Sequence, residues 1–213
     1  MSSEDDVFRY VEFVREEAGV ARQIPVSMDA IYSHFGIQPK LASLAADQQG
    51  LLLDPERGLV IINDKDPPRR QRFTQAHEMV EFLFDTLPSN QIAGLSQRIG
   101  FREPIKERLC NRAGANLLMP PDEIRSRIQT YGVGIQCADR IADEFDVSFT
   151  AALVQLSRCA EGQWAVVVWG MKNKPTEIKK AIPSTQISFL PDIPAISSPK
   201  LRVEWALSSL SHK

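Results

Sequence analysis

Apolar residues recur along most of this chain at the spacing of amphipathic helices. Val7, Tyr10, Val11 and Val14 lie three or four positions apart, which places them on one face of a helix that ends near Gly19. Several further segments have the same helical spacing of apolar residues, and proline, serine or glycine stands at their ends. The pattern predicts helices over 4–19, 25–36, 103–119, 121–130, 136–145 and 149–160. It predicts one further helix that begins at 67–68 and ends at 88–90.

Two parts of the chain have the shorter period of strands. Apolar runs at 51–53 and 59–63 flank the turn formers of 54–58, which predicts a β-hairpin. Beyond Gly162, β-prone runs cover 164–169, 187–190 and 201–207. We therefore predict an α+β fold, with a mainly helical domain and a small β-sheet over 1–160 and a β-rich C-terminal extension over 161–213.

Composition and charge narrow the classes of protein. Of the 213 residues, 43% are hydrophobic, enough for a large core. The formal net charge of -2 and the pI near 6.0 argue against a protein that binds DNA by nonspecific phosphate attraction. The N-terminus has no signal-peptide pattern, and no apolar run reaches the roughly 20 residues that span a bilayer. We expect a cytoplasmic protein without a membrane segment.

The residues that carry chemistry are concentrated in one predicted helix. Positions 77–81 read H-E-x-x-E, whereas metalloproteases of the zincin class carry H-E-x-x-H, with two zinc ligands and a glutamate base between them. Residues four apart share one face of a helix, so His77 and Glu81 can converge on one ion with Glu78 beside them. A helix with glutamates on its solvated side is the simpler alternative. The chain has only three histidines and three cysteines without C-x-x-C spacing, so carboxylates are the expected co-ligands.

Several short motifs occur in a recognisable order. The chain has R-F-T-x-A-H-E at 72–78, E-x-x-x-N at 107–111 and L-L-M-P at 117–120. Together with the segments at 24–27, 61–63 and 147–148, they resemble the ImmA/IrrE family of intracellular metallo-endopeptidases. The resemblance covers roughly 20–160. It implies a zincin-like domain that contains His77 as a metal ligand, Glu107 as a further ligand and Glu78 as the general base.

The chain departs from the family pattern at three positions. Glu81 stands where the second ligand histidine is expected, Asp85 where another histidine often occurs, and Gly114 where alanine is usual. With Glu81 as a ligand, His77, Glu81 and Glu107 would cancel the charge of a divalent ion, which then acidifies bound water less. Zinc is the first expectation for the metal, and manganese or iron are alternatives because of the added oxygen ligand. Without a cation, Glu78, Glu81 and Glu107 would repel one another.

Three functions follow as hypotheses. The first is an intracellular metal-dependent endopeptidase, which by family resemblance cleaves a helix-turn-helix transcriptional repressor in stress response or mobile-element regulation. The second is a catalytically degenerate protease-like protein that binds a regulatory protein without cleaving it. The third, a DNA-binding regulator, has least support, because the net charge is near neutral. The segment 138–153 resembles a helix-turn-helix in spacing, but it offers few basic or amide side chains for reading DNA, so we interpret it as structural. Tyr131 is a candidate for an oxyanion donor.

Overall fold

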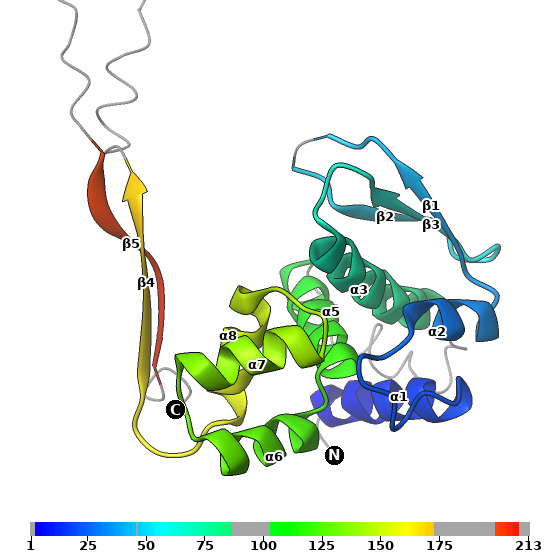
Figure 1. The fold of residues 1–213 in the computed structure, drawn as a ribbon. Helices are drawn as coiled ribbons and strands as arrows, with labels where there is room; N and C mark the ends of the chain where they lie inside the picture. The colour runs from blue at the N-terminus through cyan, green and yellow to red at the C-terminus, as the bar shows by residue number, and fades with distance from the viewer. Residues whose placement is uncertain (1–2, 46, 87–102, 173–198, 209–213) are drawn as a thin grey trace, which may run out of the picture. The chain divides into compact units, whose positions relative to one another are not determined.

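The computed structural model describes residues 3–45, 47–86, 103–172 and 199–208 (Figure 1). The chain divides into two compact units, residues 1–160 and residues 161–213, and each is described by itself. The predicted end of a helix at 88–90 and the predicted strand at 187–190 lie outside the described residues.

The first unit is mainly helical with one small sheet, so the predicted α+β class is confirmed. Its helices begin and end close to the positions that the apolar period and the breakers predicted. They are α1 (Ser3–Glu17), α2 (Met28–His34), α3 (Pro68–Thr86), α5 (Glu103–Leu118), α6 (Pro121–Tyr131), α7 (Ile135–Glu144) and α8 (Phe149–Cys159). Serine caps two of them: the Ser27 hydroxyl accepts from the Ala30 N–H at 3.1 Å, and Ser148 accepts from Ala151 at 3.2 Å.

The sheet has the strand order β1-β3-β2. The predicted hairpin is confirmed, because β2 (Gly50–Asp54) pairs antiparallel with β3 (Leu59–Asn63). β1 (Gln38–Ala42), which the hydrophobic pattern did not predict, pairs parallel with the other edge of β3. Its residues are mostly exposed, so they lack the apolar alternation that marks a half-buried strand. β2 is therefore an edge strand, and it lies next to α3 (Figure 1).

Helix α3 is central to the core. Ala76, Met79 and Val80 are buried on it, and it packs against α5 on one side and the sheet on another. Gly114 on α5 allows a close helix crossing: a Cβ there would lie 3.1 Å from the backbone nitrogen of His77 and 3.2 Å from the carbonyl carbon of Ala76. The glycine that departs from the family pattern thus lies directly against the backbone of the H-E-x-x-E turn.

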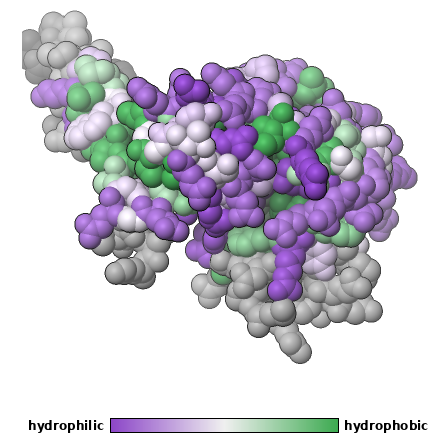
Figure 2. All heavy atoms as spheres, turned by 60° about the horizontal axis from the view of Figure 1, so that its bottom comes forward, coloured by the Kyte–Doolittle hydropathy of each residue, from purple (hydrophilic) through white to green (hydrophobic). Residues whose placement is uncertain are grey.

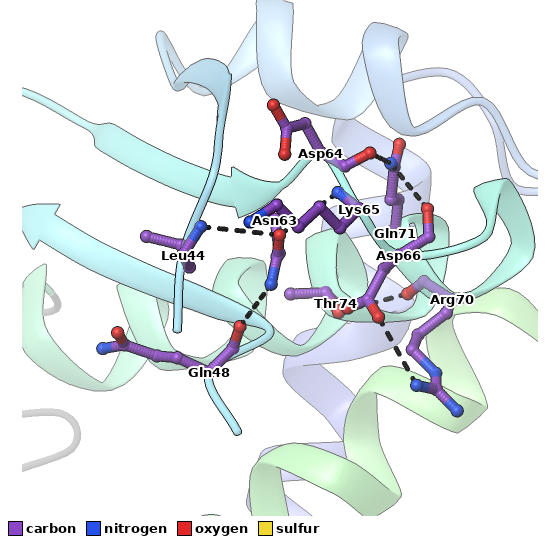
Figure 3. A network of polar contacts seen from close by, with 9 residues as sticks. All are labelled: Leu44, Gln48, Asn63, Asp64, Lys65, Asp66, Arg70, Gln71 and Thr74. Atoms are coloured by element: carbon purple, nitrogen blue, oxygen red, sulfur yellow. Dashed lines mark hydrogen bonds and ion pairs between the residues drawn. The ribbon is translucent and has the colours of Figure 1, made fainter. Parts of the chain in front are cut away.

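A buried asparagine binds the residues that lead into β2. The side chain of Asn63, only 5% exposed, donates to the Gln48 carbonyl at 2.8 Å and accepts from the backbone N–H of Lys65 at 3.2 Å (Figure 3). Gln71 on α3 donates to the Asp66 carbonyl at 2.8 Å in the same network. A buried amide that bonds backbone groups on both sides orders the loop before β2 relative to the start of α3.

The arginines at the start of α3 bind other parts of the first unit. Arg69 pairs with Asp143 at 3.0 Å and with Asp146 at 3.2 Å, which ties α3 to the turn between α7 and α8. Arg72 donates to the Val26 carbonyl. Asp143 at the end of α7 and Asp146 in the turn after it are therefore ion-paired within the first unit.

The described part of the second unit is one antiparallel pair, β4 (Ala165–Lys172) and β5 (Lys200–Ser208). The β-rich character of the rest of 161–213 stays a prediction. Figure 2 shows hydrophobic surface, in green, at the left of the view, where this pair lies. The exposed large hydrophobic side chains of the pair are Val167, Trp169, Met171, Leu201 and Val203. In the same view the first unit, taken by itself, presents a mostly hydrophilic surface (Figure 2). Among the described residues, no helix combines the length and apolar content that crossing a membrane requires.

Candidate metal centre

All four predicted site residues line one cavity of about 320 Å³. It lies between α3, α5 and the segment that leads into β2. Its walls are formed by Asp47, Gln48, Gln49, Gly50, Phe73, Thr74, His77, Glu78, Glu81, Glu107 and Asn111. The structure therefore brings together, from two helices, the side chains that the motifs singled out.

One helical turn supplies three of the four groups. A nitrogen of His77 and carboxylate oxygens of Glu78 and Glu81 all lie within 4.8 Å of one another. His77 and Glu81 are half-buried and Glu78 is buried. This is the convergence that the i, i+4 spacing predicted. Glu107 stands outside that group of three, and its Oε2 lies 3.5 Å from His77 Nε2.

Asn111 links the histidine to the glutamate of the second helix. Its Oδ1 lies 3.3 Å from His77 Nδ1, and its Nδ2 donates to Glu107 Oε1 at 2.9 Å. An imidazole whose Nδ1–H donates to Asn111 keeps the Nε2 lone pair for a ligand, as in metal sites where a second group orients the histidine. The E-x-x-x-N pattern contains Asn111, but sequence reasoning assigned it no role.

Glu78 is the buried acid of the site. Burial raises its pKa to about 8, and the charges of Glu81 and Glu107 act in the same direction, against a smaller opposite effect from the backbone of Leu52 and from Lys106. Its Oε2 is buried and has no hydrogen-bond partner among the described residues. A buried carboxylate oxygen without a donor calls for a proton, a water or a cation.

Lys106 is the residue that sequence reasoning missed entirely. Its Nζ lies 2.8 Å from Glu81 Oε1, so the carboxylate at the second-ligand position is ion-paired with α5. No local signal in the chain distinguishes this lysine from a solvated one, because the contact depends on how α5 crosses α3.

The donor set fits a divalent cation. One imidazole and several carboxylates are ligands that zinc, manganese and iron accept. The orphaned oxygen of Glu78 and the mutual repulsion of three carboxylates both favour added positive charge in the cavity. His77, Glu81 and Glu107 remain the proposed ligands and Glu78 the proposed base.

Gly50 closes the cavity next to Glu78. A Cβ at this position would lie 2.4 Å from Thr74 Cγ2 and 2.7 Å from Glu78 Oε1. We expect Gly50→Ala to destabilise the fold by about 1–3 kcal/mol, because the added methyl must displace one of these groups. Gly134→Ala is the matched control, since a Cβ there meets nothing within 4 Å. Urea unfolding measures both variants, and equal stabilities would contradict the close packing at Gly50.

Two features concern what could enter the site. A second cavity of about 540 Å³ adjoins the first, sharing Gln49, Phe73 and Asn111, and extends along Ala115, Ala151 and Val154. Its walls are largely apolar, which suits a peptide side chain.

Tyr131 lies instead at the end of α6, with the Arg140 guanidinium 4.6 Å from its ring centroid, and is not among the residues that line either cavity.

Comparisons with known proteins identify the family of this chain. The sequence profile of the IrrE N-terminal-like domain, a peptidase family, matches residues 34–157. The radiation response metalloprotease IrrE of Deinococcus radiodurans is 33% identical over 108 residues, which cover 49% of this chain and 32% of that protein. The protein of the same name from Deinococcus deserti is 35% identical over 108 residues, or 49% of this chain and 37% of its own.

The chain thus spans about a third of the length of these curated relatives. Among solved structures, a Mycobacterium tuberculosis transcriptional regulator has a similar fold, with a TM-score of 0.52 and 18% identity over 70% of this chain and 45% of that one. The family profile extends over more than half of the chain and includes every proposed site residue. The chain therefore belongs to the ImmA/IrrE family, the family of the IrrE N-terminal-like domain.

Proposed function

We propose that this protein is a cytoplasmic, metal-dependent endopeptidase. The observation that carries the proposal is the placement of His77, Glu78 and Glu81 within 4.8 Å on one helical turn, facing Glu107 on α5. A cavity large enough for a peptide side chain adjoins this cluster. The name of the Deinococcus relatives, a metalloprotease, supports the same activity.

His77, Glu81 and Glu107 would hold the metal, with zinc as the first candidate and manganese or iron as alternatives. A bound divalent ion would supply a Lewis acid for the scissile carbonyl and lower the pKa of a water molecule. Asn111 would keep the His77 ring in the required orientation by accepting from Nδ1–H.

Glu78 is the group that moves the proton. Its buried Oε2 has no donor among the described residues, so it is available to accept a proton from the attacking water. The protonated acid then donates to the nitrogen of the leaving amine, and the peptide C–N bond breaks. Burial raises the pKa of Glu78 in the metal-free cluster, and a bound cation would lower it again, toward the ionised form that accepts the proton.

The proposed substrate is a helix-turn-helix transcriptional repressor, in a stress response or in the control of a mobile element. This follows from the family resemblance. The apolar lining along Ala115, Ala151 and Val154 supports a preference for an apolar side chain beside the scissile bond.

A degenerate protease that binds its partner without cutting is the second candidate. The observation in its favour is the ion pair at the second-ligand position: Lys106 occupies one oxygen of Glu81 at 2.8 Å. A metal ion that binds Glu81 must either share the carboxylate with the Lys106 ammonium or displace the ammonium from it.

Incubation with a candidate repressor separates the two functions. The protein is supplied with zinc or manganese and compared with a chelator-treated sample and with Glu78→Gln, and mass spectrometry identifies the products. Metal-dependent cleavage that the variant lacks supports the endopeptidase. A stable complex with intact repressor in every sample supports the binding protein.

A further inference from the structure

Helix α5 presents two opposite charges to α3 from adjacent positions. The Lys106 ammonium lies 2.8 Å from Glu81 Oε1, with 22% and 30% of the two side chains exposed. The next residue, Glu107, has its Oε2 3.5 Å from His77 Nε2. The same turn of α5 therefore supplies a carboxylate to the His77 end of the cluster and a cation to the Glu81 end.

The lysine alters the formal charge of the site. With a neutral imidazole at position 81, as in the family pattern, the cluster would carry the two negative charges of Glu78 and Glu107. Glu81 adds one negative charge and Lys106 adds one positive charge. The Glu81–Lys106 pair is therefore equivalent in net charge to the histidine that it replaces.

We propose that Lys106 is a positioning residue that compensates for Glu81: it holds this carboxylate in place in the metal-free cluster and competes with a divalent cation for it. The affinity for metal is then set by the ion pair as well as by the ligands. This inference rests on the proposed function only in requiring that metal binds beside His77.

The competition has a direct physical basis. An ammonium hydrogen bond occupies a lone pair of Glu81 Oε1, which leaves fewer acceptor positions of this carboxylate for a metal. A unit positive charge a few ångströms from a divalent ion also repels it, and solvent screens this repulsion only in part because both side chains are mostly covered. The Lys106 charge also reaches Glu78, where it opposes the rise in pKa.

A metal titration tests the proposal. In competition with a chelator, Lys106→Met is expected to bind zinc or manganese about tenfold more tightly than the unmodified protein, which corresponds to about 1.4 kcal/mol. Lys106→Arg keeps the charge and should stay within about threefold. Lys40→Met, an exposed lysine on β1, controls for the change in net charge and should have no effect.

Stability without metal gives a second readout. In the presence of chelator, the Lys106→Met variant has Glu81 beside Glu78 and Glu107 without the lysine that neutralises it. The Tm of this variant should therefore be about 2–6 °C below that of the unmodified protein. Excess zinc should remove the difference. In a Glu81→Gln background the same substitution should have little effect on the metal-free Tm. If Lys106→Met cannot be purified, Lys106→Gln removes the same charge with a polar side chain.

The outcomes are separable. An affinity gain above about threefold for Lys106→Met supports the proposal, whereas a smaller gain or a loss of affinity contradicts it. His77→Ala is titrated in parallel. If His77→Ala loses the metal while Lys106→Met is unchanged, the inference about Lys106 fails and the metal site stands. If His77→Ala binds metal as before, the proposed metal site itself fails.

Discussion

Replacing Glu78 with glutamine is expected to reduce the rate of peptide hydrolysis by about 10²–10⁴-fold in the metal-loaded protein. Glutamine has nearly the same shape, so the packing against Gly50 and Thr74 is kept, but an amide cannot accept the proton of the attacking water. Metal content is measured alongside the rate. An unchanged rate at full metal occupancy would exclude Glu78 as the general base.

The same substitution should stabilise the metal-free protein at neutral and alkaline pH. The folded state raises the pKa of Glu78 from 4.5 to about 8. Between these two values the folded state binds more protons than the unfolded state, so the contribution of Glu78 is fully present below pH 4.5 and is lost as the pH rises through 8. Glutamine does not titrate, and its variant should not show this loss.

The size of the effect follows from the linkage of protons to folding. At pH 8 the difference in unfolding free energy between Glu78→Gln and the unmodified protein should reach a few kcal/mol, about 1.4 kcal/mol for each pKa unit. Urea unfolding with chelator between pH 5 and pH 8.5 measures it. If the unfolding free energies of the two proteins change in parallel over this pH range, Glu78 is not a buried acid with a raised pKa. Added zinc should reduce the advantage of the variant.

Replacing His77 with alanine is expected to weaken metal binding by at least about 100-fold. Loss of an outer-shell partner of a metal ligand commonly costs 10–100-fold, and the loss of a ligand should cost more. Of the described residues that line the cavity, His77 is the only histidine, and Asn111 lies within hydrogen-bonding distance of its ring. Hydrolysis should disappear with the metal.

A matched control is available for this histidine. His34 on α2 is exposed and lies outside the cavity lining, so His34→Ala should bind metal with unchanged affinity. Isothermal titration or equilibrium dialysis with zinc compares the two variants. Equal affinities for His77→Ala and His34→Ala would place the metal elsewhere.

The helices were predictable because each is marked locally. Apolar residues recur with the helical period, and Pro121 and Ser148 mark starts that the structure has at the same places. The second helix was predicted over 25–36 and is shorter, Met28–His34, because Ser27 caps it. Strand β1 could not be predicted from the hydrophobic pattern, because Gln38–Ala42 contains Pro39 and Lys40 and is mostly exposed. Its pairing depends on the free edge of β3, which the local pattern does not encode.

The candidate site divides in the same way. The neighbourhood of His77, Glu78 and Glu81 is a property of one helical turn and follows from their spacing. Glu107 was reached only through the family resemblance. The contacts of Lys106 and Asn111 depend on the crossing of α3 and α5. From the sequence alone, Glu81 gives the site one more negative charge than the family pattern has. In the structure, the ammonium of Lys106 cancels this charge.

An anomalous-difference map from a crystal grown with excess zinc tests the metal centre most directly. We expect a peak within coordinating distance of His77 Nε2 and of carboxylate oxygens of Glu81 and Glu107, with Lys106 displaced from Glu81 or sharing it. A cavity without a peak, with Lys106 still bound to Glu81 and Glu107 turned to solvent, would contradict the metal-dependent endopeptidase.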